Sequence, residues 1–409
     1  MATALTRRRL LHGALPMAGL AWLGPACGGG IRRTPNQAYL QLPSSPPGRV
    51  GVGRYPDATA AEVCRDVVRR VTDLSWLQQG DTVFLKVACN SGGEHPAVTC
   101  PAAVEAMVDL LRSRGAGTIY VGDQSGVADV RLTADGRESS TREMMAENGL
   151  LSAVERAGAT LHNFDDQGWD GYYQPAMGQA RSWEQTPFVP RILDQVDHVV
   201  LLPRIGSHVL AGYTCGIKIA VGWLRDDSRL ELHQRGQRFF ERIAEINLAA
   251  PLRDKLRLVL TLGTHGLLNI GPDFGAAHDF DGTLAIAATD LVDHDTVAAA
   301  LVPWLDRHDA SVFDLYSPYP ADVDFFNRRF VERIWGATAV ERYQAIQAYP
   351  LGHHVALDPC ISHLAVLTGH RPAHIDLMVT GAGLPEDLDE YLERYSGRPF
   401  RLVRSRARR

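Results

Sequence analysis

The chain has 409 residues, of which 45% are hydrophobic, so it can bury a large core in one or two domains. Its formal net charge is −5, and a chain this acidic lacks the basic surface that general nucleic-acid binding requires. After the N-terminal segment, no run approaches the roughly 20 apolar residues that a membrane-spanning helix needs.

Residues 1–26 match a twin-arginine export signal. The segment Thr6–Leu11 contains three consecutive arginines followed by apolar residues, and a short apolar run continues to Leu23. Two endings stay open: cleavage after small residues, or acylation of Cys27, which would link the protein to a membrane as a lipoprotein. Because residues 1–26 carry three Arg and no acid, the mature chain has a net charge of −5 − 3 = −8. We therefore predict an exported, extracytoplasmic protein.

The rest of the chain divides into three segments by composition. Residues 27–50 are rich in Gly, Pro and Ser and are predicted to be a linker. Residues 51–380 are predicted to form one domain, with a division into two lobes left open. Residues 381–409 are predicted to form a helix and a solvated tail rich in Arg.

Helix and strand patterns alternate along residues 51–380. The segments 82–88 and 118–122 read as strands, and the helix beginning at Pro101 between them implies a parallel pair with a right-handed crossover. Further strands are predicted at residues 160–164, 198–204, 256–262, 284–288 and 374–380, and further helices at residues 59–74, 141–157, 235–248, 295–305, 321–335 and 359–368. This alternation predicts an α/β fold with a mostly parallel sheet, helices on both faces and strand–helix–strand units.

The five cysteines after residue 27 exclude one kind of cofactor site. None has Cys-x-x-Cys spacing, so the chain has no self-contained iron–sulfur cluster motif and no zinc ribbon. Outside the cytoplasm, Cys89 and Cys100 would be able to form a disulfide; two separate buried thiols are the alternative.

Polar residues at the ends of the first two predicted strands form one candidate site. Only three of the 42 basic residues are Lys, and Lys86 lies inside an apolar strand, where an unpaired charge is costly. It either binds a ligand or forms a structural ion pair. Asn90 and the glycines after it offer donors to an anion. Asp123 follows the next strand, where it would pair with Lys86, bind a metal, act as an acid or base, or simply cap a turn.

The segment 202–218 follows another predicted strand and is the densest polar motif. Thr214 is predicted to cap a helix whose first turn binds an anion, with Lys218 one turn further on the same face. His208 is close enough in sequence to join them. Two more side chains would extend this site: Arg229 and His233.

Two clusters resemble metal sites, but each has a structural explanation. The segment 290–295 contains three Asp and one His, which is explained by a helix cap or by a hard-cation site. The second cluster includes His353, His354 and His363 around Asp358-Pro359. That pair is typical of a helix N-terminus with Pro in the first turn, which accounts for the Asp without a metal.

Taken in chain order, these segments resemble the family called domain of unknown function 362. The resemblance covers roughly residues 45–370 and is most specific in the central block. The motifs that carry it are Lys86 with Asn90; Thr99-Cys100-Pro101; Gly122-Asp123; Pro203, His208, Thr214 and Lys218; Gly271-Pro272; and Asp290-Leu291-Val292-Asp293-His294-Asp295. Many members carry ferredoxin-like cysteine motifs, which this chain lacks, so the resemblance implies redox chemistry only with a partner.

The leading hypothesis is an exported enzyme that acts on a small anionic or carbonyl-bearing ligand. In it, Lys86, Asn90 and Thr214 bind the ligand, while the catalytic residues are His208, Asp123 and Lys218; Asp123 and His208 are the candidate ligands of a divalent metal. One alternative is a non-catalytic solute-binding lipoprotein. Another is a redox subunit that borrows a cluster or flavin from a partner protein.

Overall fold

The structure of the chain is a computed structural model. It describes residues 37–269, 271–308, 320–346, 358–384, 388, 391–392 and 400–404. The predicted export signal, Cys27, His353 and His354 lie outside these residues. Within the described residues, none of the helices has both the length and the apolar composition needed to span a membrane.

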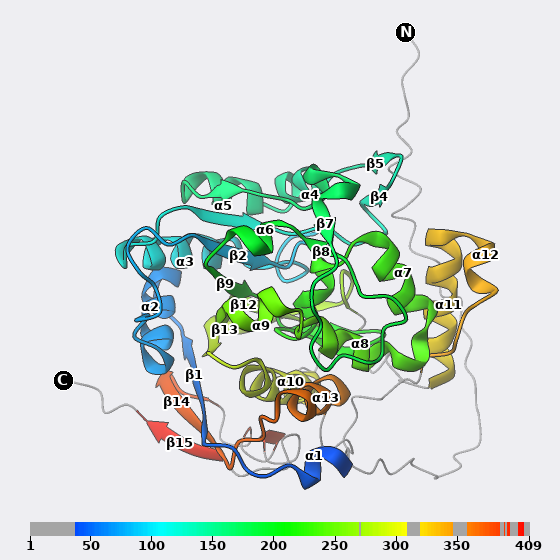
Figure 1. The fold of residues 1–409 in the computed structure, drawn as a ribbon. Coiled ribbons are helices and arrows are strands. Elements are labelled where there is room, and N and C mark those ends of the chain that lie inside the picture. The colour runs from blue at the N-terminus through cyan, green and yellow to red at the C-terminus, as the bar shows by residue number, and fades with distance from the viewer. Residues whose placement is uncertain are drawn as a thin grey trace. The chain divides into compact units, whose positions relative to one another are not determined.

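An 11-stranded sheet runs through the described part of the chain (Figure 1). Its order is β15 (Phe400–Arg404), β14 (Ile375–Gly381), β1 (Gly48–Tyr55), β13 (Ala276–Ala288), β12 (Leu256–Leu268), β9 (His198–Leu202), β2 (Val83–Val87), β3 (Ile119–Gly122) and β6 (Thr160–Leu161). Two short strands, β10 (Gly206–His208) and β11 (Gly212–Thr214), extend the edge of β12. Along the main path only β13 is antiparallel to its described neighbours, which confirms the predicted mostly parallel α/β sheet.

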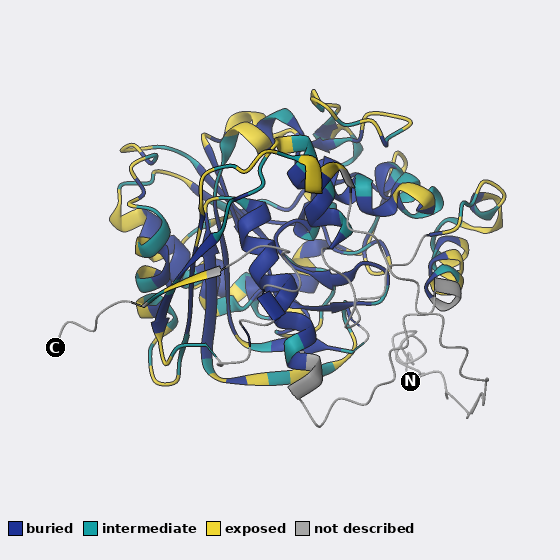
Figure 2. Cartoon of the chain, turned by 90° about the horizontal axis from the view of Figure 1, so that it is seen from below, coloured by how far each residue is buried: buried dark blue, intermediate teal, exposed yellow. Residues whose placement is uncertain are grey.

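Helices cover both faces of this sheet, as the sequence predicts. One face packs against α2 (Ala60–Val71), α3 (Pro101–Ser113), α4 (Thr141–Glu147) and α5 (Leu150–Arg156). The other packs against α6 (Ile192–Gln195), α7 (Asp226–Gln234), α8 (Phe239–Ile246), α9 (Ala250–Lys255), α10 (Leu291–His308) and α13 (Pro359–Thr368). In β2, Phe84 faces this second core, whereas Leu85 faces the first. The strands are buried on both sides and the exposed residues lie mainly on outer helices and loops (Figure 2).

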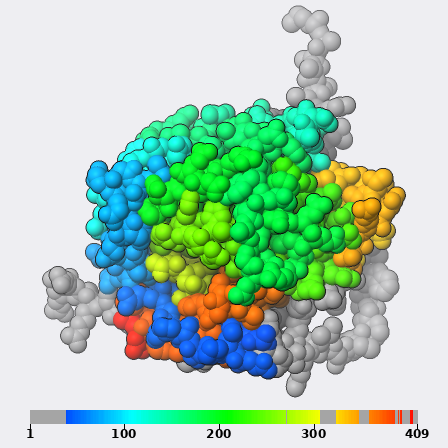
Figure 3. Space-filling model, viewed as in Figure 1, coloured from blue at the N-terminus to red at the C-terminus, as the bar shows by residue number. Residues whose placement is uncertain are grey.

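The remaining elements are short or peripheral. They are α1 (Gln37–Gln41), α11 (Pro320–Trp335), α12 (Ala337–Val340), β4 (Arg131–Thr133), β5 (Gly136–Glu138), β7 (Tyr172–Tyr173), β8 (Val189–Pro190), and the 3-10 helices η2 (Asp165–Gln167), η3 (Trp169–Gly171), η4 (Lys218–Trp223) and η5 (Gly236–Arg238). In the space-filling view, α1 in blue and the orange segment that contains α13 lie side by side (Figure 3).

Several predicted boundaries differ from the structure. The helix predicted at residues 141–157 is two helices, because Gly149 between them has φ 85°. The strands β12 and β13 are 13 residues each and form a long antiparallel hairpin. β1 begins at Gly48, inside the predicted linker. β15 lies inside the predicted basic tail, where Arg401 donates two hydrogen bonds to Asp376 of the neighbouring strand.

Cys89 and Cys100 are not joined, so the disulfide alternative is wrong in this structure. The Cys89 thiol is buried, with Asn148 Nδ2 at 3.3 Å and Ser125 Oγ at 3.6 Å from its sulfur. Burial raises the pKa of Cys89 to about 12, so this thiol stays protonated at neutral pH.

The carboxyl ends of the parallel strands meet at one edge of the sheet, where ligands bind in open α/β folds. Gly122 is the last residue of β3, and a Cβ there would overlap the carbonyl oxygen of His162. The missing side chain therefore lets the chain after β6 pass directly over the end of β3. Phe164 in this segment donates its backbone N–H to the carbonyl of Asp123, so the segment also packs over Asp123.

We predict that Gly122→Ala lowers the free energy of unfolding by about 1–3 kcal/mol, the usual cost of overpacking a buried site. Chemical denaturation of the full chain measures it. Gly93→Ala is the control, because its added Cβ would lie 3.3 Å from its nearest neighbours, at an exposed position. Equal stability of the two variants would contradict the close packing at Gly122.

Candidate functional site

A buried ion pair lies at the ends of β2 and β3. The two strands are paired so that Lys86 is opposite Gly122, which places Asp123 beside the lysine side chain. Lys86 Nζ lies 2.5 Å from Asp123 Oδ1, and the two residues are 0% and 3% exposed. Burial lowers the pKa of Lys86, an effect opposed by the charge of Asp123.

All the hydrogen-bonding capacity of this lysine is used inside the protein. Besides Asp123, its ammonium donates to the carbonyls of Val87 at 3.0 Å and Ile219 at 3.4 Å. Asp123 in turn accepts the backbone N–H groups of Cys89 and Gln124. An ammonium has three protons and all three have acceptors, so Lys86 has none left for a ligand.

The ion pair supports η4, the segment that begins with Lys218. The Ile219 carbonyl belongs to η4, and a Cβ on Gly222 in the same segment would overlap both Lys86 Nζ and Asp123 Oδ1. The ring of Trp223 lies 5.3 Å from Lys86 Nζ. The structural ion pair, one of the two readings of Lys86, is thus what the structure contains. In this structure the Lys86–Asp123 pair fixes the start of η4.

Asn90 belongs to a second group, with a residue that sequence reasoning did not select. Its Nδ2 lies 2.9 and 2.7 Å from the two carboxylate oxygens of Asp273, and Ser91 Oγ lies 3.0 Å from the same carboxylate. Asp273 follows β12, whose carboxyl end lies at the same edge of the sheet as that of β2. Asn90 therefore holds an acidic residue, where the sequence predicted an anion-binding role.

Arg204, in the loop after β9, is the second residue that the site prediction left out. It is 4% exposed, and its guanidinium donates to the carbonyls of Pro272 at 2.7 Å and Pro96 at 3.4 Å. Burial lowers the pKa of Arg204 to about 10, so the side chain remains charged at neutral pH. Within the described chain it forms no ion pair with a carboxylate.

His208 lies in β10 and is 6% exposed. Its Nδ1 accepts the backbone N–H groups of Leu210 at 3.1 Å and Ala211 at 3.2 Å. Burial and the charges of Lys218 and Arg204 hold the pKa of His208 well below its usual value. The ring is therefore neutral at neutral pH. Because Nδ1 is an acceptor, the single ring proton is on Nε2.

Lys218 is the first residue of η4 and differs from Lys86 in every contact. Its ammonium makes no hydrogen bond and no ion pair with the described residues, and the residue is half-buried. Burial, together with the charge of Arg204, lowers the pKa of Lys218 to about 7, an effect that Cys360 and Asp273 oppose. The charge of Arg204 thus lowers the pKa of both Lys218 and His208, and these three side chains form one electrostatic cluster.

Thr214 does not cap a helix, contrary to the sequence prediction. It ends β11, where it pairs with Gly206 of β10. The backbone N–H groups of Gly216 and Ile217 at the start of η4 donate to Asp295 instead, at 2.9 and 2.7 Å. The anion that the sequence placed in this turn is therefore the protein's own carboxylate.

The predicted extension of the site by Arg229 and His233 has a structural explanation. Arg229 donates to four backbone carbonyls, those of Leu224, Ser125, Gln124 and Gly222. His233 Nδ1 lies 2.9 Å from Asn327 of α11. Arg229 thus holds backbone segments next to η4, and His233 joins α7 to α11.

Comparison with known proteins identifies the family. Residues 83–300 match the family described as "Domain of unknown function (DUF362)". The chain belongs to the DUF362 family. No curated protein matches it. A solved structure, the lactate racemase apoprotein from Thermoanaerobacterium thermosaccharolyticum, aligns with a TM-score of 0.40 and 10% identity over 85% of this chain and 86% of that chain. A similarity this low supports no inference about activity.

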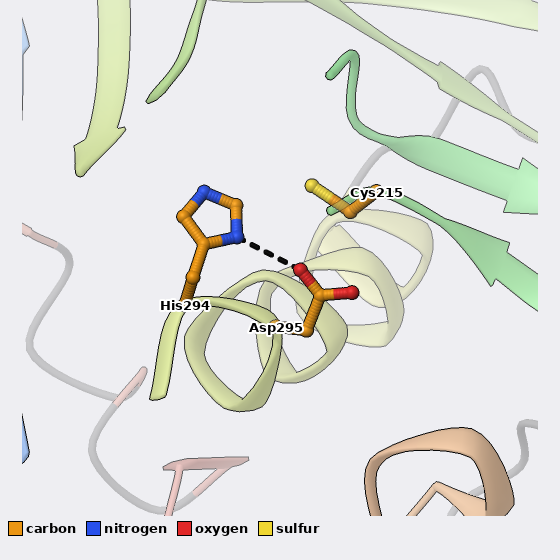
Figure 4. A group of neighbouring side chains, drawn as sticks. All are labelled: Cys215, His294 and Asp295. Carbon is orange, nitrogen blue, oxygen red and sulfur yellow. Dashed lines mark hydrogen bonds and ion pairs between the residues drawn. The ribbon is translucent and has the colours of Figure 1, made fainter. Parts of the chain in front are cut away.

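Among the described residues of the DUF362 domain, Cys215, His294 and Asp295 form a buried group with metal-ligand chemistry (Figure 4). All three side chains already have hydrogen-bond partners within the protein. His294 Nδ1 lies 2.8 Å from Asp295, and Thr261 Oγ1 lies 3.2 Å from both His294 Nε2 and Cys215 Sγ. Burial raises the pKa of Cys215 well above its usual value. A metal would have to replace this network and deprotonate the thiol, so the residues fit a packed hydrogen-bond cluster better than a metal centre.

A second group, Asp290, Asp293 and His370, is partly exposed. Asp290 Oδ1 accepts the N–H groups of Val292 and Asp293 at the start of α10, which is the predicted helix cap. His370 Nε2 lies 2.9 Å from Asp293. Burial alone would lower the pKa of His370, but the hydrogen bond to Asp293 and the two carboxylate charges outweigh it, so this pKa is raised. A cap and an ion pair account for the group.

Neither group includes Asp123 or His208, the two residues predicted as metal ligands. The other metal-like motif also has a structural role in its described part. Asp358 accepts the N–H groups of Cys360 and Ile361 and so caps α13, as predicted. His363 lies 3.3 Å from Glu245.

We predict that Lys86→Met lowers the free energy of unfolding by about 3–5 kcal/mol, because it leaves Asp123 charged and buried without a partner. The double variant Lys86→Met/Asp123→Leu should lose less than the sum of the two single changes. Chemical denaturation of all four proteins gives this coupling. Additive losses would show that the two side chains do not act as a pair.

Proposed function

We propose that this DUF362 protein is an enzyme that binds a small anionic or carbonyl-bearing ligand at Lys218, Arg204 and His208. One observation supports it above all. The charge of the buried Arg204 lowers the pKa of the half-buried Lys218, and neither cation has a carboxylate partner in the described chain.

Such an arrangement is costly in a folded protein without a ligand. Taking a charge out of water is unfavourable unless a partner of opposite charge or several hydrogen bonds replace the water. Lys86 meets this requirement completely, whereas Lys218 does not. An anionic ligand would supply the missing partner for both Lys218 and Arg204.

The perturbed amine favours catalysis over simple binding. With a pKa of about 7, Lys218 exists as both amine and ammonium at neutral pH, as an acid–base or nucleophilic group requires. The neutral His208 presents an N–H on Nε2 as a donor. A solute-binding protein would gain nothing from a lysine in this state, so the enzyme is the preferred reading over the non-catalytic lipoprotein.

We predict that simple anions such as acetate and phosphate bind more weakly as the pH rises through about 7. A lowered pKa means that Lys218 in the unliganded protein loses its charge over this range, while Arg204 keeps its own. Isothermal titration calorimetry on either side of neutral pH measures the effect.

The variant Lys218→Met should lose about tenfold or more in affinity, as expected for a charge-assisted hydrogen bond, and should lose the pH dependence. Lys255→Met is the matched control, because the Lys255 ammonium donates to the Leu193 carbonyl away from the cluster. Unchanged anion binding in Lys218→Met would refute the proposed site.

We also propose that the protein is exported through the twin-arginine pathway, on the strength of the motif at residues 6–11 and the short apolar run that follows. Replacing Arg7, Arg8 and Arg9 together by Lys keeps the charge but removes the arginine pair. This variant should remain in the cytoplasm in cell fractionation, whereas the parent chain should be exported. Export of both proteins would contradict the proposal.

The variant Cys27→Ser separates acylation from cleavage, since only an acylated protein would lose membrane association.

A further inference from the structure

We propose that the outer face of α11 binds the surface of an anionic lipid membrane. Arginines on this face would contact the lipid phosphates, and two phenylalanines beside them would enter the boundary of the acyl chains. The inference does not depend on the proposed function, because α11 contributes no residue to the cluster of Lys218, Arg204 and His208.

One side of α11 is fixed to the rest of the described chain. Val323, Asn327 and Val331 lie on this side and are buried. Asn327 Nδ2 donates to the His233 carbonyl at 2.9 Å, and Asn327 Oδ1 lies 2.9 Å from His233 Nδ1, so the helix is joined to α7 by two contacts. Figures 1 and 3 show α11 and α12, in gold, outside the helices that cover the sheet. The other side of α11 therefore has a fixed direction, towards solvent.

The solvent side of α11 combines aromatic and charged residues. Phe325 and Phe326 are 57% and 51% exposed, and their ring centroids are 6.0 Å apart. The exposed charged residues of this side are Arg328, Arg329, Glu332 and Arg333. With 3.6 residues per turn, the six positions fall within one arc of about 160°, near whose centre Phe325 lies. They therefore form one surface, which we call the outer face of α11.

The described chain does not neutralise the arginines of the outer face. Arg329 has a carboxylate partner, Glu332, at 2.9 Å. Arg328 and Arg333 make no hydrogen bond or ion pair with any described residue. Asp324, at the flank of the helix, is hydrogen-bonded within the protein. The outer face thus has a net charge of +3 − 1 = +2, on a chain whose formal charge is −5, so the partner that it fits is anionic.

The two phenylalanines favour a membrane among the anionic partners. A purely polar surface of phosphates or carboxylates would leave both rings without an apolar contact. A membrane interface places phosphates and acyl chains within one layer, so that arginines bind the headgroups while neighbouring rings enter the apolar boundary. With 16 residues, α11 would lie along the surface, since none of the described helices has the length and composition to span a bilayer.

The expected contact is weak and reversible. A few charges and two rings orient a protein at a membrane, whereas stable attachment requires a second signal. Acylation of Cys27, which the sequence leaves open, would be such a signal. The contact through α11 does not require it.

Flotation of the full chain with lipid vesicles tests the outer face. Vesicles of equal parts phosphatidylglycerol and phosphatidylcholine are compared with vesicles of phosphatidylcholine alone. We expect binding to the anionic vesicles that weakens as salt is added, because salt screens exposed charges. The variants Arg328→Gln/Arg333→Gln and Phe325→Ser/Phe326→Ser should each lower the partition coefficient about tenfold. Only the phenylalanine variant should keep the salt dependence of the parent.

Matched controls separate this face from general charge and exposure. Arg114→Gln/Arg142→Gln removes the same two charges from exposed positions on other helices. Phe274→Ser removes a ring that is 76% exposed in the β12–β13 hairpin. Both controls should bind as the parent does. A loss in the controls equal to that in the α11 variants would overturn the proposal.

Cross-linking shows which segment touches the lipid, since residues 1–26 are themselves basic and apolar. With a photoactivatable phosphatidylglycerol in the vesicles, we expect adducts in the tryptic peptide that ends at Arg328 and contains Phe325 and Phe326. Adducts confined to residues 1–36 would overturn the role of α11.

Polyglutamate tests the other class of anionic partner. Binding of polyglutamate that is lost in Arg328→Gln/Arg333→Gln, without binding of the anionic vesicles, would assign the outer face to an acidic protein and overturn the membrane. A parent chain that binds neither probe would also overturn it.

Discussion

The buried ion pair between Lys86 and Asp123 is the contact on which the rest of the candidate site depends. It joins the ends of two neighbouring strands and also fixes η4 through the Ile219 carbonyl. The pair is possible because the strands are parallel, so that residues separated by 37 positions emerge side by side at one edge. A buried pair of this kind contributes specificity of structure more dependably than net stability.

The ion pair also explains why the contacts of the two lysines differ. Since the Ile219 carbonyl and Gly222 pack onto Lys86, the start of η4 is fixed on one side of the pair, and Lys218 enters an environment that already contains Arg204. Asp295 fixes the same turn from the other face through the N–H groups of Gly216 and Ile217. The turn is therefore held between two carboxylates, and neither of them reaches the Lys218 amine.

The sequence was sufficient for the fold class and for the segments that meet at the site. An alternation of apolar runs with helical patterns implies a parallel sheet, and parallel strands bring their following loops together. Lys86 inside an apolar strand was already notable, because charge in such a strand requires a reason. The pattern could not separate an ion pair from a ligand contact, since both place the same residue at the same position.

What the sequence could not provide depends on contacts between distant segments. Asp273 meets Asn90 across 183 residues, and Asp295 meets Gly216 across 79. Thr214 was assigned to a helix cap because Thr followed by an apolar stretch has that local signature, but β10 offered it a strand partner. Arg204 was passed over because it is one of many arginines; only its burial sets it apart. Cluster residues of this type need a tertiary structure to be recognised.

The long β12–β13 hairpin has a consequence for how a ligand would be received. β12 continues well past the end of β9, and its last residues pair with β13 and with β10, so the loop that carries Asp273 begins from a rigid ladder. Asn90 and Ser91 then hold its carboxylate. For the ligand proposed above, the carboxylate of Asp273 would therefore already be fixed before binding, so that less ordering of side chains would oppose association.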